Sequence, residues 1–298
     1  MKPALNRRQA LLAGGAAWCC TLPIARANDT RTLNFVIVSD THLGRNDNDV
    51  AERNWLQAID EINQQPGEFV LHLGDVVDGG RPAQYPRYAE LRKRLHKPIH
   101  EIPGNHDPVD LFRQHIAKPI DRVLDCGDFR FLLINNAHRD SHHGFITGEQ
   151  LQWLDRQCVE ASKQSRLAVL CCHVPIHSNK HPDRGWYVLP QDGQREFYEL
   201  RERHSATLIA SLHGHFHNGI RGWRDHGEMV ETLLPSVCYN QSRGLAEHLQ
   251  AGRADGFFVD ELRPGYVLAE LGQGRLKLQY KPLRHEPNGE YAAKWPAK

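Results

Sequence analysis

The stretch that decides the fold is residues 33–42, which read LNFVIVSDTH. Its first seven residues are mostly apolar and β-branched and predict a short buried strand, with the polar residues Asp40 and His42 at the carboxyl end. Similar apolar runs that end in polar residues recur along the chain and predict strands at residues 68–73, 97–102, 167–172 and 207–212. The repetition indicates a sheet that carries polar groups along one edge.

Helical patterns separate these strands. Apolar residues at helical spacing predict helices at residues 50–65, 83–95, 148–162 and 193–204, and a further strand is predicted at residues 129–135. Alternating strands and helices predict an α/β fold with a largely parallel sheet, in which ligand sites gather at the carboxyl ends of the strands. Residues 266–271 and 275–280 predict an antiparallel hairpin, which indicates a second sheet packed on the first.

Metal-binding side chains follow five of the predicted strands. They are Asp40 and His42, Asp75, Asn105 with His106, His173, and His215 with His217. Residues two apart at a strand end can point to one side, which is a chelating geometry. In a chain with 19 histidines, one such pair is more often a loop feature, but repetition at five strand ends favours a shared metal site. Glycine precedes three of these clusters, at Gly74, Gly104 and Gly214, where close backbone approach is useful.

These residues stand in five short motifs. In order, they are SDTH (39–42), GDVVD (74–78), GNHD (104–107), CHVP (172–175) and GHFH (214–217). The ordered set resembles the motifs of the calcineurin-like metallophosphoesterases, over roughly residues 33–220. The resemblance implies a four-layer α/β/β/α sandwich of two mixed sheets, with a dinuclear metal centre at the carboxyl edge of the strands.

The resemblance also implies roles for the motif residues. One ion would take Asp40, His42 and His217, the other Asn105, His173 and His215, and Asp75 would bridge them. Imidazole, carboxylate and amide ligands without a thiolate suit Fe, Mn, Zn or Co. Two such ions can clamp a phosphoryl group and supply hydroxide for its in-line displacement. By the same resemblance, His106 would protonate the leaving alkoxide or stabilise the transition state, with Asp78 orienting its ring. Asp78 could equally be a helix cap.

Two loops are candidates for substrate recognition. Residues 138–143 and 177–186 offer cations, hydrogen-bond donors and an aromatic ring near the third and fourth strand ends. The candidate substrate residues are Arg139, His143, Lys180, Arg184 and Trp186. The cations would hold phosphate oxygens and Trp186 would stack on a base; the alternative is that these loops are simply solvated.

The finer resemblance is to the branch that contains class III cyclic-nucleotide phosphodiesterases and glycerophosphodiesterases. Protein-phosphatase branches typically carry an arginine after the second motif, where this chain has Gly79 and Gly80. We therefore expect a phosphodiesterase that acts on a small cyclic nucleotide or glycerophosphodiester. The alternatives are a phosphomonoesterase or nuclease with the same metal centre, or a non-catalytic metal-binding module, against which the intact Asp75, Asn105 and His106 argue.

The N-terminus has the pattern of an export signal. The pair Arg7 and Arg8, the apolar run at residues 10–23 and the small residues around Ala27 predict a signal peptide over residues 1–27, typical of the twin-arginine type, with a Sec-type signal as the alternative. Residues 28–298 would then form one metallophosphoesterase domain in the periplasm. No later stretch is long enough to predict a transmembrane anchor.

The composition gives no sign of a polyanion-binding protein. The chain has 37 Lys and Arg against 36 Asp and Glu, with both signs interspersed, so no broad nucleic-acid surface is expected. Two of the seven cysteines fall within the predicted signal peptide, and the other five have no Cys-x-x-Cys spacing. We expect these five to be buried thiols, with a disulfide in an oxidising compartment as the alternative.

Overall fold

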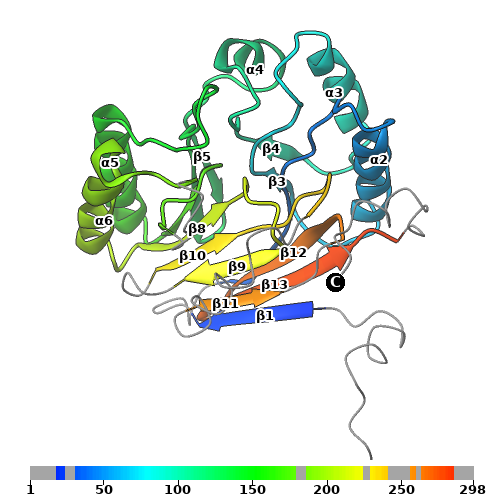
Figure 1. Ribbon diagram of the computed structural model, residues 1–298. Helices are drawn as coiled ribbons and strands as arrows, with labels where there is room; N and C mark the ends of the chain where they lie inside the picture. The colour runs from blue at the N-terminus through cyan, green and yellow to red at the C-terminus, as the bar shows by residue number, and fades with distance from the viewer. Residues whose placement is uncertain are drawn as a thin grey trace, which may run out of the picture.

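The computed structural model describes residues 31–178, 186–223, 229–240 and 263–284, together with the backbone of 18–23 and 256–259. Two mixed sheets pack face to face, and helices cover the outer face of each sheet, so the chain forms four layers (Figure 1). The predicted α/β/β/α sandwich is confirmed.

The first sheet has six strands in the order β1-β13-β12-β2-β3-β4. Their bounds are Trp18–Pro23, Arg275–Pro282, Gly265–Gly272, Leu33–Val38, Val70–His72 and Ile99–Glu101. β2, β3 and β4 run parallel, whereas β12 and β13 form the predicted antiparallel hairpin beside β2. The carboxyl ends of β2, β3 and β4 therefore meet at one edge.

The second sheet has seven strands in the order β11-β9-β10-β8-β7-β6-β5. Their bounds are Gly256–Val259, Ile220–Trp223, Val230–Leu233, Leu208–His213, Leu167–Cys171, Phe129–Leu133 and Arg122–Cys126. β6, β7, β8 and β10 are parallel, and β5, β9 and β11 are antiparallel to their neighbours. The expectation of a largely parallel sheet was wrong, because antiparallel strands flank the parallel core of both sheets.

The helices divide between the two outer faces. α2 (Val50–Ile62), α3 (Gln84–Arg92) and α4 (Val109–His115) lie on the side of the first sheet. α5 (Gly148–Lys163) and α6 (Gln194–Arg203), preceded by the short 3-10 helix η1 (Pro190–Asp192), lie on the other side (Figure 1). All four predicted helices are confirmed, and α4 was not predicted.

Apolar side chains fill three layers between these elements. Phe35 and Phe131 pack edge to face between the two sheets, with ring centroids 5.3 Å apart. Trp55 of α2 and Tyr88 of α3 stack beneath the first helical layer. Cys171 lies in the core between the sheets, whereas Cys172 lies in the core under α5 and α6, as expected for neighbours on a strand.

Among the described residues, the five cysteines expected to be thiols form no disulfide: Cys126, Cys158, Cys171, Cys172 and Cys238. Four of them are buried, and Cys126 is half-buried. Burial raises the pKa of the Cys171 and Cys238 thiols well above the ordinary value, so these groups stay protonated. Buried cysteines in such an environment are expected to be unreactive thiols.

Part of the predicted signal peptide is described as a strand. The backbone of Trp18–Pro23 forms β1, which pairs antiparallel with β13 at the lower edge of the sheet in Figure 1. Residues 1–17 and 24–30, which include the arginine pair and the small residues of the cleavage site, lie outside the described residues. Export and cleavage after Ala27 stay predictions.

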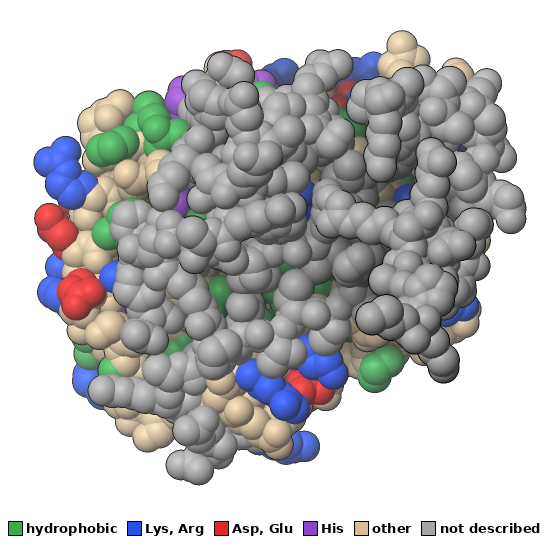
Figure 2. Space-filling view, turned by 60° about the horizontal axis from the view of Figure 1, so that its bottom comes forward, with side chains coloured by type: hydrophobic (Ala, Val, Ile, Leu, Met, Phe, Trp, Pro, Cys, Tyr) green, Lys and Arg blue, Asp and Glu red, His purple; other side chains and the backbone are tan. Residues whose placement is uncertain are grey.

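Within the described part of the chain, none of the helices has the length and apolar character needed to cross a membrane. Figure 2 turns the lower face of Figure 1 forward and shows basic and acidic side chains close together on the described surface of that face. This mixture of signs agrees with the nearly balanced charge of the sequence.

Candidate dinuclear metal centre

The side chains expected to bind metal come together where strands of both sheets end. Those of the first sheet follow β2, β3 and β4, and those of the second follow β7 and β8. Five of these residues have a left-handed backbone: Asp40 (φ 55°), His42 (φ 45°), Asp75 (φ 54°), His215 (φ 79°) and His217 (φ 54°). Such conformations are uncommon outside glycine and cluster at functional sites. Five of the nine described non-glycine residues with a positive φ therefore lie at the candidate site.

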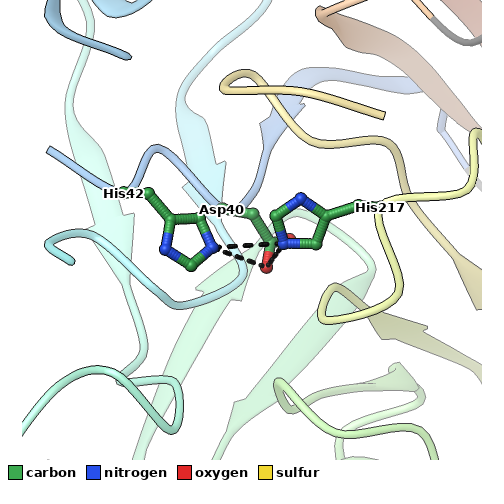
Figure 3. Close-up of side chains that lie close together, drawn as sticks. All are labelled: Asp40, His42 and His217. Carbon is green, nitrogen blue, oxygen red and sulfur yellow. Dashed lines mark hydrogen bonds and ion pairs between the residues drawn. The ribbon is translucent and has the colours of Figure 1, made fainter. Parts of the chain in front are cut away.

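Asp40, His42 and His217 form the first group of ligand atoms (Figure 3). Nε2 of His42 lies 3.1 Å from Nε2 of His217, and Oδ1 of Asp40 lies 3.1 Å from the same His217 nitrogen. All three side chains are buried, and their ligand atoms lie within 4.8 Å of one another. The group matches the set that the resemblance implies for one ion.

Asp75, His173 and His215 form the second group. Nε2 of His173 lies 3.3 Å from Oδ2 of Asp75 and 3.2 Å from Nδ1 of His215. The same Oδ2 atom lies 3.5 Å from Nε2 of His42, which belongs to the first group. Asp75 is thus placed between the two groups, as a bridging ligand would be.

Hydrogen bonds on the outer side fix each imidazole. The four pairs are His42 Nδ1 with Asp78 Oδ1 (3.1 Å), His173 Nδ1 with the Leu73 carbonyl (2.7 Å), His217 Nδ1 with the Tyr239 carbonyl (2.9 Å), and His215 Nε2 with the His142 carbonyl (3.1 Å). These acceptors take the outer ring N–H, so the other nitrogen of each ring faces the site. Metal-binding histidines are commonly held in this way.

Asn105 supplies the clearest evidence that the pocket fits a cation. Its side chain is buried, and its Oδ1 atom has no hydrogen-bond partner in the described structure. A buried carbonyl oxygen without a partner costs about 1–3 kcal/mol. Coordination by Oδ1 would remove this cost, so the side chains present fit the expected second ion.

The buried carboxylates remain ionised. Burial would raise the pKa of Asp40, but the nearby His217 and His173 hold it below its ordinary value. The pKa of Asp75 is likewise low because His173 and His42 outweigh its burial. For His173, burial lowers the pKa and Asp75 raises it, and the net value is about 9. Two buried negative charges therefore attract a positive charge to this point.

The three glycines are required by close packing. A Cβ on Gly104 would overlap the carboxylate of Asp75, and one on Gly214 would overlap the Ser39 hydroxyl. A Cβ on Gly74 would lie 2.6 Å from Nδ1 of His173. Each glycine thus gives a ligand side chain the space that it occupies.

His106 lies at the more open side of the site, with a side chain that is 32% exposed. Its Nδ1 accepts the backbone N–H of Gly79 at 3.2 Å, so the neutral ring carries its proton on Nε2. Oδ1 of Asp78 is 3.5 Å from Nδ1 of His106 but 3.1 Å from Nδ1 of His42. Asp78 therefore contacts both rings, and the closer contact is with His42.

A cavity of about 320 Å³ opens over these groups. Its lining residues are His42, Arg45, Asp75, Asp78, Asn105, His106, His142, Trp186, His215, His217 and Tyr239. Of the predicted substrate residues, Trp186 lines it. Arg139 is exposed and, like His143, does not line it, while Lys180 and Arg184 lie outside the described residues.

Sequence reasoning missed three lining residues: Arg45, His142 and Tyr239. Arg45 stands only three positions after His42, so a cation close to the first motif was a usable signal. His142 adjoins the predicted His143. Tyr239 gave no such signal, because it reaches the site by following β10, a strand that was not predicted.

Comparisons with known proteins agree with this geometry. The sequence profile described as "Calcineurin-like phosphoesterase" matches residues 33–219. The chain is 25% identical to the 3',5'-cyclic adenosine monophosphate phosphodiesterase of Haemophilus influenzae, over 85% of this chain and 90% of that protein. It is 27% identical to an Arcobacter nitrofigilis protein named "Probable glycerophosphodiester phosphodiesterase GpdQ", over 61% and 71% of the two chains.

The fold is also similar to that of a solved structure. A dimetal phosphatase from Danio rerio superimposes with a TM-score of 0.58 and 14% identity, over 84% of this chain and 99% of that one. At this identity the likeness concerns the fold alone.

Proposed function

This chain belongs to the calcineurin-like phosphoesterase family and is a hydrolase of phosphate esters, and from this premise we propose that it is a phosphodiesterase acting on a 3',5'-cyclic nucleotide. The relatives that carry this activity in their names span most of the chain. Glycerophosphodiesters are the second candidate substrates, because a relative with that name is similarly close.

The observation that carries the diester preference is the composition of the cavity wall. Among the described lining residues, Arg45 is the one Arg or Lys side chain, so the wall offers a single permanent cation beside the expected ions. A phosphodiester carries one negative charge and a phosphomonoester up to two. A diester also has a second organic arm, and the rings of Trp186 and His142, 4.5 Å apart, offer an aromatic surface for it.

Residues of the chain have separate parts in the proposed reaction. When bound, two metal ions would polarise the phosphoryl group and make hydroxide available at neutral pH. His106 faces the cavity with the proton on Nε2 and can donate it to the leaving alkoxide. Its backbone N–H donates to Oδ1 of Asp75 at 2.8 Å, which keeps the proposed acid next to the bridging carboxylate.

For a cyclic nucleotide, Trp186 would stack on the base. Its indole lines the cavity and lies 5.5 Å from the ring of His215, so a base placed there would be close to the phosphoryl position. Aromatic stacking on a nucleobase is typically worth about 1–3 kcal/mol. A glycerol arm would gain much less from the same surface, so Trp186 separates the two candidate substrates.

The experiment compares esters on protein stripped of metal and reloaded with Mn, Zn, Co or Fe. We expect metal-dependent hydrolysis of bis-p-nitrophenyl phosphate to exceed that of p-nitrophenyl phosphate, and 3',5'-cyclic AMP to be cleaved faster than glycerophosphodiesters. Trp186→Leu should raise KM for cyclic AMP by about tenfold and leave the hydrolysis of glycerophosphodiesters nearly unchanged. Preference for the monoester would instead indicate a phosphatase, and two bound metals without turnover would indicate a binding module.

We also propose that the enzyme is exported to the periplasm through its N-terminal segment. Arg7 and Arg8, followed by the apolar run at residues 10–23, support this proposal. N-terminal sequencing of protein recovered from the periplasm should begin at Asn28. Recovery from the cytoplasm with residues 1–27 intact would overturn it.

A further inference from the structure

Arg45 is a cation at the cavity wall that makes no direct ion pair with a described carboxylate. Its guanidinium carbon lies 4.0 Å from the centroid of the Tyr239 ring. It is half-buried, and none of the described carboxylates forms an ion pair with it. Asp47 and Asp78 act on its charge only at longer range, and the guanidinium lines a cavity that holds the expected phosphoryl site.

Both members of this pair are tied to the first ligand group. The backbone N–H of Arg45 donates to the His42 carbonyl at 3.1 Å. The carbonyl of Tyr239 accepts the Nδ1 proton of His217 at 2.9 Å, and the two rings lie 4.3 Å apart. The guanidinium is thus linked to the residues expected to hold one ion in two ways. Its own backbone contacts His42, and the ring beneath it contacts His217.

The chemistry of the pair favours a bound anion as the direct partner of the guanidinium. A guanidinium stacked on an aromatic ring keeps its charge and its in-plane N–H donors. These donors fit the oxygens of a phosphoryl group, which Arg can bind through two parallel hydrogen bonds. A surface arginine held only for stability would be expected to pair with a carboxylate, as Arg94 pairs with Asp60 at 3.2 Å.

We propose that Arg45 binds a non-bridging oxygen of the scissile phosphoryl group and that Tyr239 is a positioning residue that holds the guanidinium over the site. The assignment rests on the proposed function, because it takes the phosphoryl group to be the ligand of the neighbouring metal centre. Arg45 would then be a substrate contact in addition to the metal ions and His106.

The test uses inorganic phosphate as the probe and calorimetric binding to the metal-loaded protein as the readout, so it does not depend on turnover. Arg45→Gln should weaken phosphate binding by about 10- to 100-fold, the usual effect of losing a hydrogen-bonded charge. Arg45→Lys should restore part of this loss. Arg94→Gln removes an arginine from the surface and should bind phosphate like the wild type. Metal content, measured on each variant by mass spectrometry, should remain at two ions.

The role of Tyr239 has its own test. Tyr239→Phe keeps the ring and should bind phosphate within about threefold of the wild type, whereas Tyr239→Leu should weaken binding by up to about tenfold. If Tyr239 acts through Arg45, adding Tyr239→Leu to Arg45→Gln should cause no further loss. A fully additive double variant would overturn the positioning role.

The outcomes also separate this inference from the proposed function. Wild-type phosphate affinity in Arg45→Gln with both metals present would overturn the Arg45 assignment and leave the phosphodiesterase proposal standing. If the wild-type protein does not hydrolyse diesters but Arg45→Gln still loses most of its phosphate affinity, the proposed activity is refuted. The contact between Arg45 and phosphate then stands.

Discussion

Asp78 accepts a 3.1 Å hydrogen bond from His42, between Oδ1 and Nδ1. His42 contributes its other nitrogen to the first ligand group, so the carboxylate acts behind an expected metal ligand. The same oxygen is 3.5 Å from Nδ1 of His106, but that nitrogen already accepts a hydrogen bond from the backbone N–H of Gly79. The geometry therefore assigns Asp78 first to metal binding and only second to the proposed acid.

Asp78→Asn should lower metal affinity by about 10- to 100-fold, the common effect of losing the outer partner of a metal-binding histidine. Chelator competition with Zn or Mn measures the change. At saturating metal, most of the turnover should return. Unchanged metal affinity with low turnover at every metal concentration would instead place the role of Asp78 at His106.

Asp75→Asn should abolish metal retention and activity together. The substitution removes the charge of the residue whose Oδ2 atom lies 3.5 Å from Nε2 of His42 in the first group and 3.3 Å from Nε2 of His173 in the second. Metal per protein after gel filtration, measured by mass spectrometry, should fall well below two. Activity retained in this variant would refute the bridging arrangement.

His106→Ala should leave metal binding intact and reduce turnover by about 10²–10⁴, the usual share of a general acid. The reason is that the ring lines the cavity but belongs to neither of the two ligand groups described above. A substrate with a good leaving group, such as p-nitrophenolate, needs less protonation and should lose less. An equal loss on cyclic AMP and bis-p-nitrophenyl phosphate would contradict proton donation.

Gly104→Ala should destabilise the protein by about 1–3 kcal/mol and reduce its metal content, because the added methyl group would overlap the Asp75 carboxylate. Gly148→Ala is the matched control, since a Cβ at Gly148 meets no atom within 4 Å. Its unfolding free energy should stay within about 0.5 kcal/mol of the wild type. Urea denaturation measures both.

Stability of the metal-free protein should fall as the pH drops below about 6.5. Burial lowers the pKa of His213 to about 3, so between these values the unfolded chain binds a proton at this residue and the folded protein does not. This residue alone contributes a loss of about 1.4 kcal/mol per pH unit. His213→Gln should reduce the slope of unfolding free energy against pH by that amount in acid and leave it unchanged above pH 7.

Among the strands, those whose side chains are almost all buried gave the clearest sequence pattern. β2, β6, β7 and β8 are nearly continuous apolar runs, and each was recognised. β5 was missed because it is an edge strand with half-buried side chains, and α4 because seven residues give too short a helical pattern. β9, β10 and β11 were also missed, and they are short, at four residues each.

The candidate site was also predicted in part from sequence. Its ligand residues were found because chemistry-bearing side chains directly follow recognisable strands. Asp78 was associated with His106 because the two motifs are related by resemblance, whereas its shorter contact with His42 depends on how the loops after β2 and β3 pack. The pairing of Arg45 with Tyr239 joins segments nearly two hundred positions apart and requires the three-dimensional structure.

Each group of ligand atoms draws on both sheets. Asp40 and His42 follow a strand of the first sheet and meet His217 from the second, while Asp75 of the first sheet meets His173 and His215 of the second. Neither half of the chain contains a complete ion site, so ions that bind only the native chain add their binding free energy to the docking of the two sheets. Two fragments of the chain, one carrying each set of motifs, should therefore reassemble more readily when metal is supplied.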